Sequence, residues 1–176
     1  MKSALDFLRQ KSVLHAPPGK PFILKSGAES MTYIDVRLTA LSSDGLHAVA
    51  EALYERLAGM KINANLVAGV ALGGCPLATG VSLMSGLDAL YVRPEAKDHG
   101  TSKLVEGAFH PGDRVVLLED VITSGGSTLK AIAALRSAGL TVAGVIAVLD
   151  REQGGAGPIQ HECPFTALFT LKELLA

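Results

Sequence analysis

Three stretches of the chain are apolar almost without interruption, and each has the length of a β-strand: residues 65–72 (NLVAGVAL), 114–121 (RVVLLEDV) and 141–150 (TVAGVIAVLD). Strands that are apolar on both faces are typical of a parallel sheet with helices on both sides. Apolar residues at helical spacing separate these strands, in segments that end at Gly59 and Gly139. The sequence therefore predicts an α/β fold with an open, mainly parallel sheet flanked by helices.

Shorter patterns predict the remaining elements. We expect short strands over residues 21–26, 31–37 and 89–93, and helices over residues 3–11, from Ser42 to Gly59, from Pro76 to Gly86 and over 126–139. Residues 94–113 are polar and have no clean period. Because no repeat or linker divides the chain, we predict a single domain over residues 1–176, with residues 1–40 forming a small N-terminal hood of strands and a helix.

Charge and cysteine content limit the possible partners. The chain has 16 basic and 17 acidic side chains, a balance that argues against a broad nucleic-acid-binding surface. The N-terminal segment carries charges where a signal peptide would be apolar, and we find no window long and apolar enough for a membrane helix. Cys75 and Cys163 are isolated, which predicts reduced thiols rather than a disulfide scaffold or a zinc site. We expect a cytoplasmic protein without a membrane or nucleic-acid partner.

Residues 115–128 (VVLLEDVITSGGST) carry the strongest functional signal. Glu119 and Asp120 lie where the buried strand ends, and ligands of open parallel sheets bind at that end. The residues 123–128 are glycines and hydroxyl side chains that lead into a helix, whose unpaired N–H groups favour an anion. The segment lacks the lysine of a Walker loop, so it predicts a cradle for a single phosphate group.

The two carboxylates would repel a phosphate unless they face another group. Vicinal hydroxyls of a ribose, with Mg²⁺ nearby, are a natural target because carboxylates accept hydrogen bonds from both hydroxyls. Residues 115–128 therefore predict a site for a ribose 5-phosphate. The alternative is an ordinary strand-to-helix turn with a Ser/Thr cap, which explains Thr123 and Ser124 but not the paired acids.

This segment resembles the phosphoribosyl pyrophosphate (PRPP) motif of type I phosphoribosyltransferases. Three further stretches resemble orotate phosphoribosyltransferases: residues 22–37 (FILKSGAESMTYIDVR), 91–107 (YVRPEAKDHGTSKLVEG) and 148–155 (VLDREQGG). Residues 69–80 (GVALGGCPLATG) fit the loop that holds pyrophosphate in the superfamily. The resemblance implies the type I phosphoribosyltransferase fold and transfer of ribose 5-phosphate from PRPP to orotate, which yields orotidine 5′-monophosphate in the synthesis of UMP.

Departure of pyrophosphate needs cations, and residues 91–107 supply them. The resemblance implies that Lys97 reaches into the neighbouring subunit's site, so it predicts a homodimer with shared sites. The catalytic residues that we expect are Lys97, His99, Arg93 and Asp120. Those that we expect to bind PRPP are Arg93, Lys97, His99, Glu119, Asp120, Val121, Thr123, Ser124, Gly125, Gly126 and Ser127. Mg²⁺ would be held mainly by the substrate, and we assign no protein ligands to it.

Orotate carries a carboxylate, and arginine is the side chain best shaped to bind one. The resemblance implies that Arg151 does so, and that Lys25, Tyr33 and Thr123 contact the base. Core packing is an equal alternative for Tyr33, and a surface ion pair is an alternative for Arg151.

Some positions fit the family less closely. Pro94 stands where the family usually has a second lysine, and Leu72–Gly73 stands where one branch has Tyr-Lys. Asp35 and Arg37 match the family, but an ion pair between them would explain them equally well. Two rival functions are a phosphoribosyltransferase for another base and a non-catalytic PRPP-sensing regulator.

Overall fold

A six-stranded sheet forms the centre of the molecule in the computed structural model, which describes residues 2–23, 27, 29–95 and 103–176. The strand order is β10-β9-β8-β5-β6-β7, and all neighbours are parallel except β6 and β7. The strands are β5 (Leu66–Val70), β6 (Asp88–Val92), β7 (Val105–Glu106), β8 (Arg114–Ile122), β9 (Thr141–Asp150) and β10 (Phe165–Thr170). This confirms the predicted open, mainly parallel sheet.

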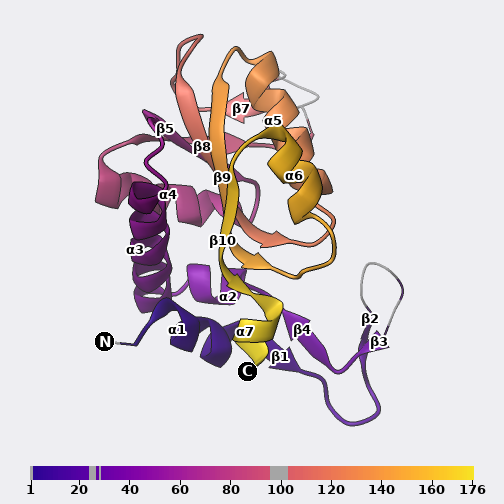
Figure 1. Cartoon of the computed structure of the whole chain (residues 1–176). Helices are drawn as coiled ribbons and strands as arrows, with labels where there is room; N and C mark the ends of the chain where they lie inside the picture. The colour runs from indigo at the N-terminus through magenta and orange to yellow at the C-terminus, as the bar shows by residue number, and fades with distance from the viewer. Residues whose placement is uncertain (1, 24–26, 28, 96–102) are drawn as a thin grey trace.

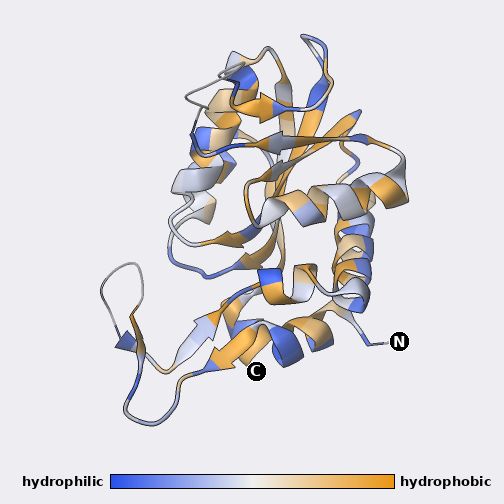
Figure 2. Cartoon of the chain, turned by 180° about the vertical axis from the view of Figure 1, so that it is seen from behind, coloured by the Kyte–Doolittle hydropathy of each residue, from blue (hydrophilic) through white to orange (hydrophobic). Residues whose placement is uncertain are grey.

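Helices cover both faces of this sheet, as the apolar strands require. One face packs against α3 (Ser43–Gly59) and α4 (Gly74–Ser85), and the other against α5 (Gly126–Ser137) and α6 (Ala156–Glu162). Alternation along β8 illustrates the division, since Val116 and Leu118 belong to the first core and Val115 and Leu117 to the second. Figure 2 shows the central strands as mainly hydrophobic, whereas polar residues interrupt the helices.

The N-terminal elements form a hood beyond the carboxyl end of the sheet (Figure 1). They are α1 (Ala4–Lys11), β1 (Val13–His15), β2 (Phe22–Ile23), β3 (Glu29–Ser30), β4 (Thr32–Ile34) and α2 (Arg37–Ala40). The strand expected over residues 31–37 ends at Ile34, and it pairs with β1 rather than with the segment at 21–26. β1 has three residues and no apolar period, so the sequence did not predict it.

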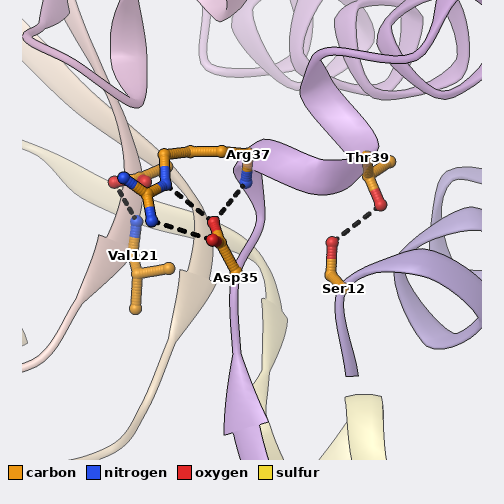
Figure 3. Close-up of polar contacts among 6 residues, drawn as sticks. Ser12, Asp35, Arg37, Thr39 and Val121 are labelled. Carbon is orange, nitrogen blue, oxygen red and sulfur yellow. Dashed lines mark hydrogen bonds and ion pairs between the residues drawn. The ribbon is translucent and has the colours of Figure 1, made fainter. Parts of the chain in front are cut away.

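A buried pair of hydroxyls ties α2 to the rest of the hood. The Oγ atom of Ser12 and the Oγ1 atom of Thr39 lie 2.7 Å apart, and both residues are fully buried. The backbone N–H of Asp35 donates to the carbonyl of Ser12 at 2.9 Å. These contacts fix the start of α2 relative to α1 and β1 (Figure 3).

The C-terminal residues form three elements that the sequence did not predict: α6, β10 and α7 (Leu171–Leu175). They are short and only partly buried, so their apolar periodicity is weak. Arg56 on α3 donates to the Thr166 hydroxyl and to the Ala167 carbonyl of the edge strand β10, both at 2.8 Å. Arg9 on α1 donates to two carbonyls of α7, which joins the C-terminus to the hood. No helix among the described residues is both long and apolar enough to cross a membrane.

Candidate functional site

Two adjoining hollows lie where the carboxyl ends of the strands face the hood. The hood hollow, of about 380 Å³, is lined by residues 33–37, 70–73 and 119–121 with Thr123, Ser127 and Arg151. The loop hollow, of about 550 Å³, is lined by Val70, Ala71, residues 92–95, Val121, residues 123–127, Lys130, Ala131, Arg151 and Gln153. The hollows share six residues and so form one continuous cleft, of a size that suits a small ligand. The structure thus brings residues 119–121 and 123–127 of the 115–128 motif together with Tyr33, Arg93 and Arg151.

The turn between β8 and α5 has the geometry of an anion cradle. Gly125 precedes α5 with a φ of 77°, a left-handed conformation that favours glycine. Gly155 packs against the turn so closely that a β-carbon there would lie 2.6 Å from the Thr123 carbonyl oxygen and 2.8 Å from the Gly125 nitrogen. The first N–H groups of a helix have no partner within it, and those of α5 begin beside the loop hollow.

Glu119 and Asp120 occupy different environments although they are adjacent. Glu119 is buried, and its Oε2 atom accepts hydrogen bonds from the hydroxyls of Thr128 at 3.0 Å and Ser127 at 3.3 Å. Burial, followed by the charge of Asp120, raises the pKa of Glu119 to about 8. Asp120 is half-buried, so it is the more accessible of the two carboxylates. That both carboxylates face ribose hydroxyls stays a prediction, and the geometry favours Asp120 for that contact.

The loop between β5 and α4 lies directly against Asp120. A β-carbon at Gly73 would be 2.0 Å from the Oδ2 atom of Asp120, so a larger residue there would displace the carboxylate. The Oδ1 atom of Asp120 accepts a hydrogen bond from the N–H of Val121 at 2.8 Å. This loop therefore closes the hood hollow on the side where the resemblance places pyrophosphate.

The hood supplies Tyr33, Asp35 and Arg37 to the cleft. The ring of Tyr33 is 36% exposed and lies 5.5 Å from that of Phe22, so Tyr33 is on the cleft wall rather than in the core. The Nε and Nη2 atoms of Arg37 donate to the two carboxylate oxygens of Asp35, each at 2.8 Å (Figure 3). The predicted ion pair is thus present, and its hydrogen bonds with Arg37 hold the pKa of Asp35 below its usual range.

Arg151 follows β9 at the junction of the two hollows. Its backbone N–H donates to the Ile122 carbonyl at 2.9 Å, which places it beside the end of β8. Its Nε atom is buried and has no hydrogen-bond partner in the described part of the chain. A buried donor of this kind is costly unless a ligand pairs with it. Arg151 lines both hollows, and it forms no ion pair with the described residues.

Arg93 lines the loop hollow and forms an ion pair with Glu106 at 3.6 Å. Lys97, His99 and Lys25, which the sequence also assigned to the site, lie outside the described residues. Lys130 lines the loop hollow and was not predicted. The sequence could have indicated this residue, because Lys130 lies one turn into α5. Side chains of a helix lean toward its N-terminus, which here is the phosphate cradle.

Comparison with known proteins gives consistent matches. Residues 41–164 match the family described as the phosphoribosyl transferase domain. The orotate phosphoribosyltransferase of Sorangium cellulosum is 47% identical over 164 residues, which cover 89% of this chain and 85% of that protein. The enzyme of the same name from Aquifex aeolicus is 40% identical over 180 residues, covering 99% and 97%. The crystal structure of Mycobacterium tuberculosis H37Rv orotate phosphoribosyltransferase in complex with PRPP matches with a TM-score of 0.82 at 30% identity, covering 98% of this chain and 97% of that one.

Proposed function

This chain belongs to the orotate phosphoribosyltransferase family of phosphoribosyltransferases, and we propose that it transfers ribose 5-phosphate from PRPP to orotate, releasing pyrophosphate. The observation that carries the proposal is the continuous cleft that joins the β8–α5 turn, the β5–α4 loop, the hood and Arg151. The cleft thereby offers three groups to PRPP and orotate when both are bound: a cradle for the 5-phosphate, a carboxylate for the ribose hydroxyls, and a cation for the carboxylate of orotate. The product enters pyrimidine synthesis as the precursor of UMP.

The reaction breaks the bond between ribose C1 and the pyrophosphate oxygen and forms a bond from C1 to a ring nitrogen of orotate, whose proton is released to water. We assign the 5-phosphate to residues 123–127 and the ribose hydroxyls to Asp120. The electron pair leaves with pyrophosphate, so cations must stabilise the departing group. Arg93 is the described residue of segment 91–107 that lines the cleft, and we expect Lys97 and His99 to act with it.

Orotate is assigned to the junction of the hollows. The guanidinium of Arg151 has a buried N–H to donate to the carboxylate of the base. Tyr33 and Thr123 line the same hollow, and Lys25 is expected to complete the site. A purine has no carboxylate, so pairing with Arg151 would distinguish orotate from purine bases.

Mg²⁺ is proposed to accompany PRPP, where it would neutralise charge on the pyrophosphate. Among the described residues, no three His, Cys, Asp or Glu side chains lie together in a way that could hold a metal ion without a substrate. The residues present suit a metal held by substrate oxygens and water, with Asp120 as a carboxylate within the same hollow. We further propose a cytoplasmic homodimer in which Lys97 of each subunit completes the other subunit's site.

The test is orotate consumption, followed by ultraviolet absorbance with purified protein, PRPP and Mg²⁺. We expect loss of orotate that requires PRPP and falls by at least about a hundredfold in Lys97→Ala. Lys172→Ala is the matched control, because Lys172 lies on α7 and does not line the cleft. A panel of other bases runs in parallel. Turnover of another base instead of orotate, or PRPP binding without turnover of any base, would contradict the proposal.

A further inference from the structure

We propose that Arg37, held in position by Asp35, binds the pyrophosphate group of PRPP and of the released product. The inference rests on the proposed function and adds to it a cation from the hood, which lines the hood hollow, whereas Arg93 lines the loop hollow. Arg37 is thereby assigned to substrate binding, and Asp35 is assigned as its positioning residue.

Arg37 has a fixed orientation and hydrogen-bond donors to spare. Two of its side-chain N–H groups bond the two oxygens of Asp35, and its backbone N–H donates to Asp35 Oδ1 at 3.1 Å. A guanidinium has five N–H donors. The other three form no hydrogen bond with any residue that the structure describes, and the side chain is 44% exposed. A pre-oriented fork of free donors is the arrangement that binds phosphate oxygens most effectively.

The backbone that carries Arg37 is also held firmly. Arg37 is the first residue of α2, and two residues later Thr39 forms the buried hydroxyl pair with Ser12. Asp35, on the other side, bonds the Ser12 carbonyl through its backbone N–H. The guanidinium is thus fixed at both its side-chain partner and its backbone, so binding an anion costs little reorganisation.

The position of Arg37 matches the place where pyrophosphate leaves the ribose. Arg37 lines the hood hollow together with Leu72, Gly73 and Asp120. Figure 3 shows its side chain extending from α2 toward Val121 at the end of β8. Arg37 also interacts electrostatically with Asp120, the carboxylate assigned to the ribose hydroxyls. Those hydroxyls are close to C1 in PRPP, so a cation beside Asp120 is beside the leaving group.

The distribution of charge supports pyrophosphate over orotate as the partner of Arg37. Of the described residues that line the hood hollow, Arg37 and Arg151 are the cations, and Arg151 is assigned to the orotate carboxylate. The chain has Pro94 where the family usually has a second lysine, and Gly73 where one branch of the family has a lysine. Arg37 therefore adds a positive charge to the cleft, which lacks a lysine at these two positions.

The test compares Arg37→Gln with Arg136→Gln. Arg136 also forms an ion pair, with Glu162, and its side chain is equally exposed at 44%, but it lines neither hollow. Binding of PRPP and of pyrophosphate is measured by calorimetry with Mg²⁺ and without orotate, and KM is measured for both substrates. We expect Arg37→Gln to weaken PRPP and pyrophosphate binding by about tenfold, the effect of roughly one charge-assisted hydrogen bond, with an unchanged KM for orotate. Arg136→Gln should change none of these values.

Two further variants separate the roles of charge and position. Arg37→Lys keeps the charge but loses the fork, and Asp35→Asn keeps the guanidinium but loosens its anchor, so each should weaken pyrophosphate binding by about threefold. Equal binding by wild type and Arg37→Gln would overturn the inference, as would a rise in the KM for orotate alone. Circular dichroism and thermal melting confirm that each variant is folded. Failure of the proposed function is distinct, because wild type itself would then not consume orotate.

Discussion

The two sides of the hood hollow hold their charged groups in different ways. On the sheet side, Glu119 is 4% exposed and is held by burial and by hydroxyls of α5. On the hood side, the side chain of Arg37 is 44% exposed and is held by a paired ion contact. Burial holds a side chain in place but destabilises its charged form. In an ion pair near the surface, by contrast, both partners remain charged. The sheet side is therefore suited to a rigid cradle and the hood side to a permanent cation.

Gly155→Ala should break the sheet side most severely. Its β-carbon would meet the Thr123 carbonyl and the Ile122 side chain at 2.6 Å, and backbone atoms of this turn cannot move aside without losing the cradle. We expect a loss of about 3 kcal/mol in the free energy of unfolding, measured by urea denaturation, together with loss of PRPP binding. Gly157→Ala is the matched control because its β-carbon would meet no atom within 4 Å. Equal stability of the two variants would refute the close packing of the turn.

Glu119→Gln should change how stability depends on pH. The folded protein raises the pKa of Glu119 from its ordinary value of 4.5 to about 8, so the folded state retains a proton that the unfolded chain loses. The resulting stabilisation is complete below the ordinary value and is lost as the pH rises through about 8. Glu119→Gln stays neutral, so we expect it to be more stable than wild type at about pH 9, by on the order of 3 kcal/mol, in unfolding experiments without substrate. Parallel pH profiles for both proteins would contradict this assignment.

Thr39→Val tests the buried hydroxyl pair that holds the hood side of the cleft in place. It removes one partner of the buried hydroxyl pair and leaves the other without its bond, at a cost of about 1–2 kcal/mol in the free energy of unfolding. The double variant Ser12→Ala/Thr39→Val should cost less than the sum of the two single variants, because no unpaired hydroxyl remains. Strictly additive losses in urea denaturation would show that the two hydroxyls do not depend on each other.

Pro94→Lys should give the smallest effect. It tests whether a further cation in segment 91–107 increases activity. It restores a cation where the family usually has one, beside the loop hollow. An exposed charge contributes about 0.5 kcal/mol, so we expect kcat/KM for PRPP to rise roughly twofold. Pro94→Gln is the control for the change in backbone freedom. An equal gain in both variants would assign the effect to the backbone rather than to the charge.

The sheet side could be predicted from the sequence far better than the hood side. The strands of residues 66–70, 114–122 and 141–150 are long and apolar, and the 115–128 motif lies on one of them, so its position at the sheet end followed directly. The hood strands have two or three residues each, and their pairing depends on contacts between distant segments. The sequence allowed an ion pair between Asp35 and Arg37 but could not place it beside Asp120. The raised pKa of Glu119 likewise depends on its burial in the folded chain.

The contact of Arg56 with β10 has a consequence for self-association. β10 is an edge strand, and the outward polar groups of such strands can pair with a strand from another molecule and start aggregation. Arg56 occupies the Ala167 carbonyl and brings a positive charge to this edge. A strand that paired with the Ala167 carbonyl would have to displace the guanidinium of Arg56. Arg56 thus makes this edge of the sheet a poorer template for pairing between molecules, while the opposite edge of the sheet is the short antiparallel strand β7.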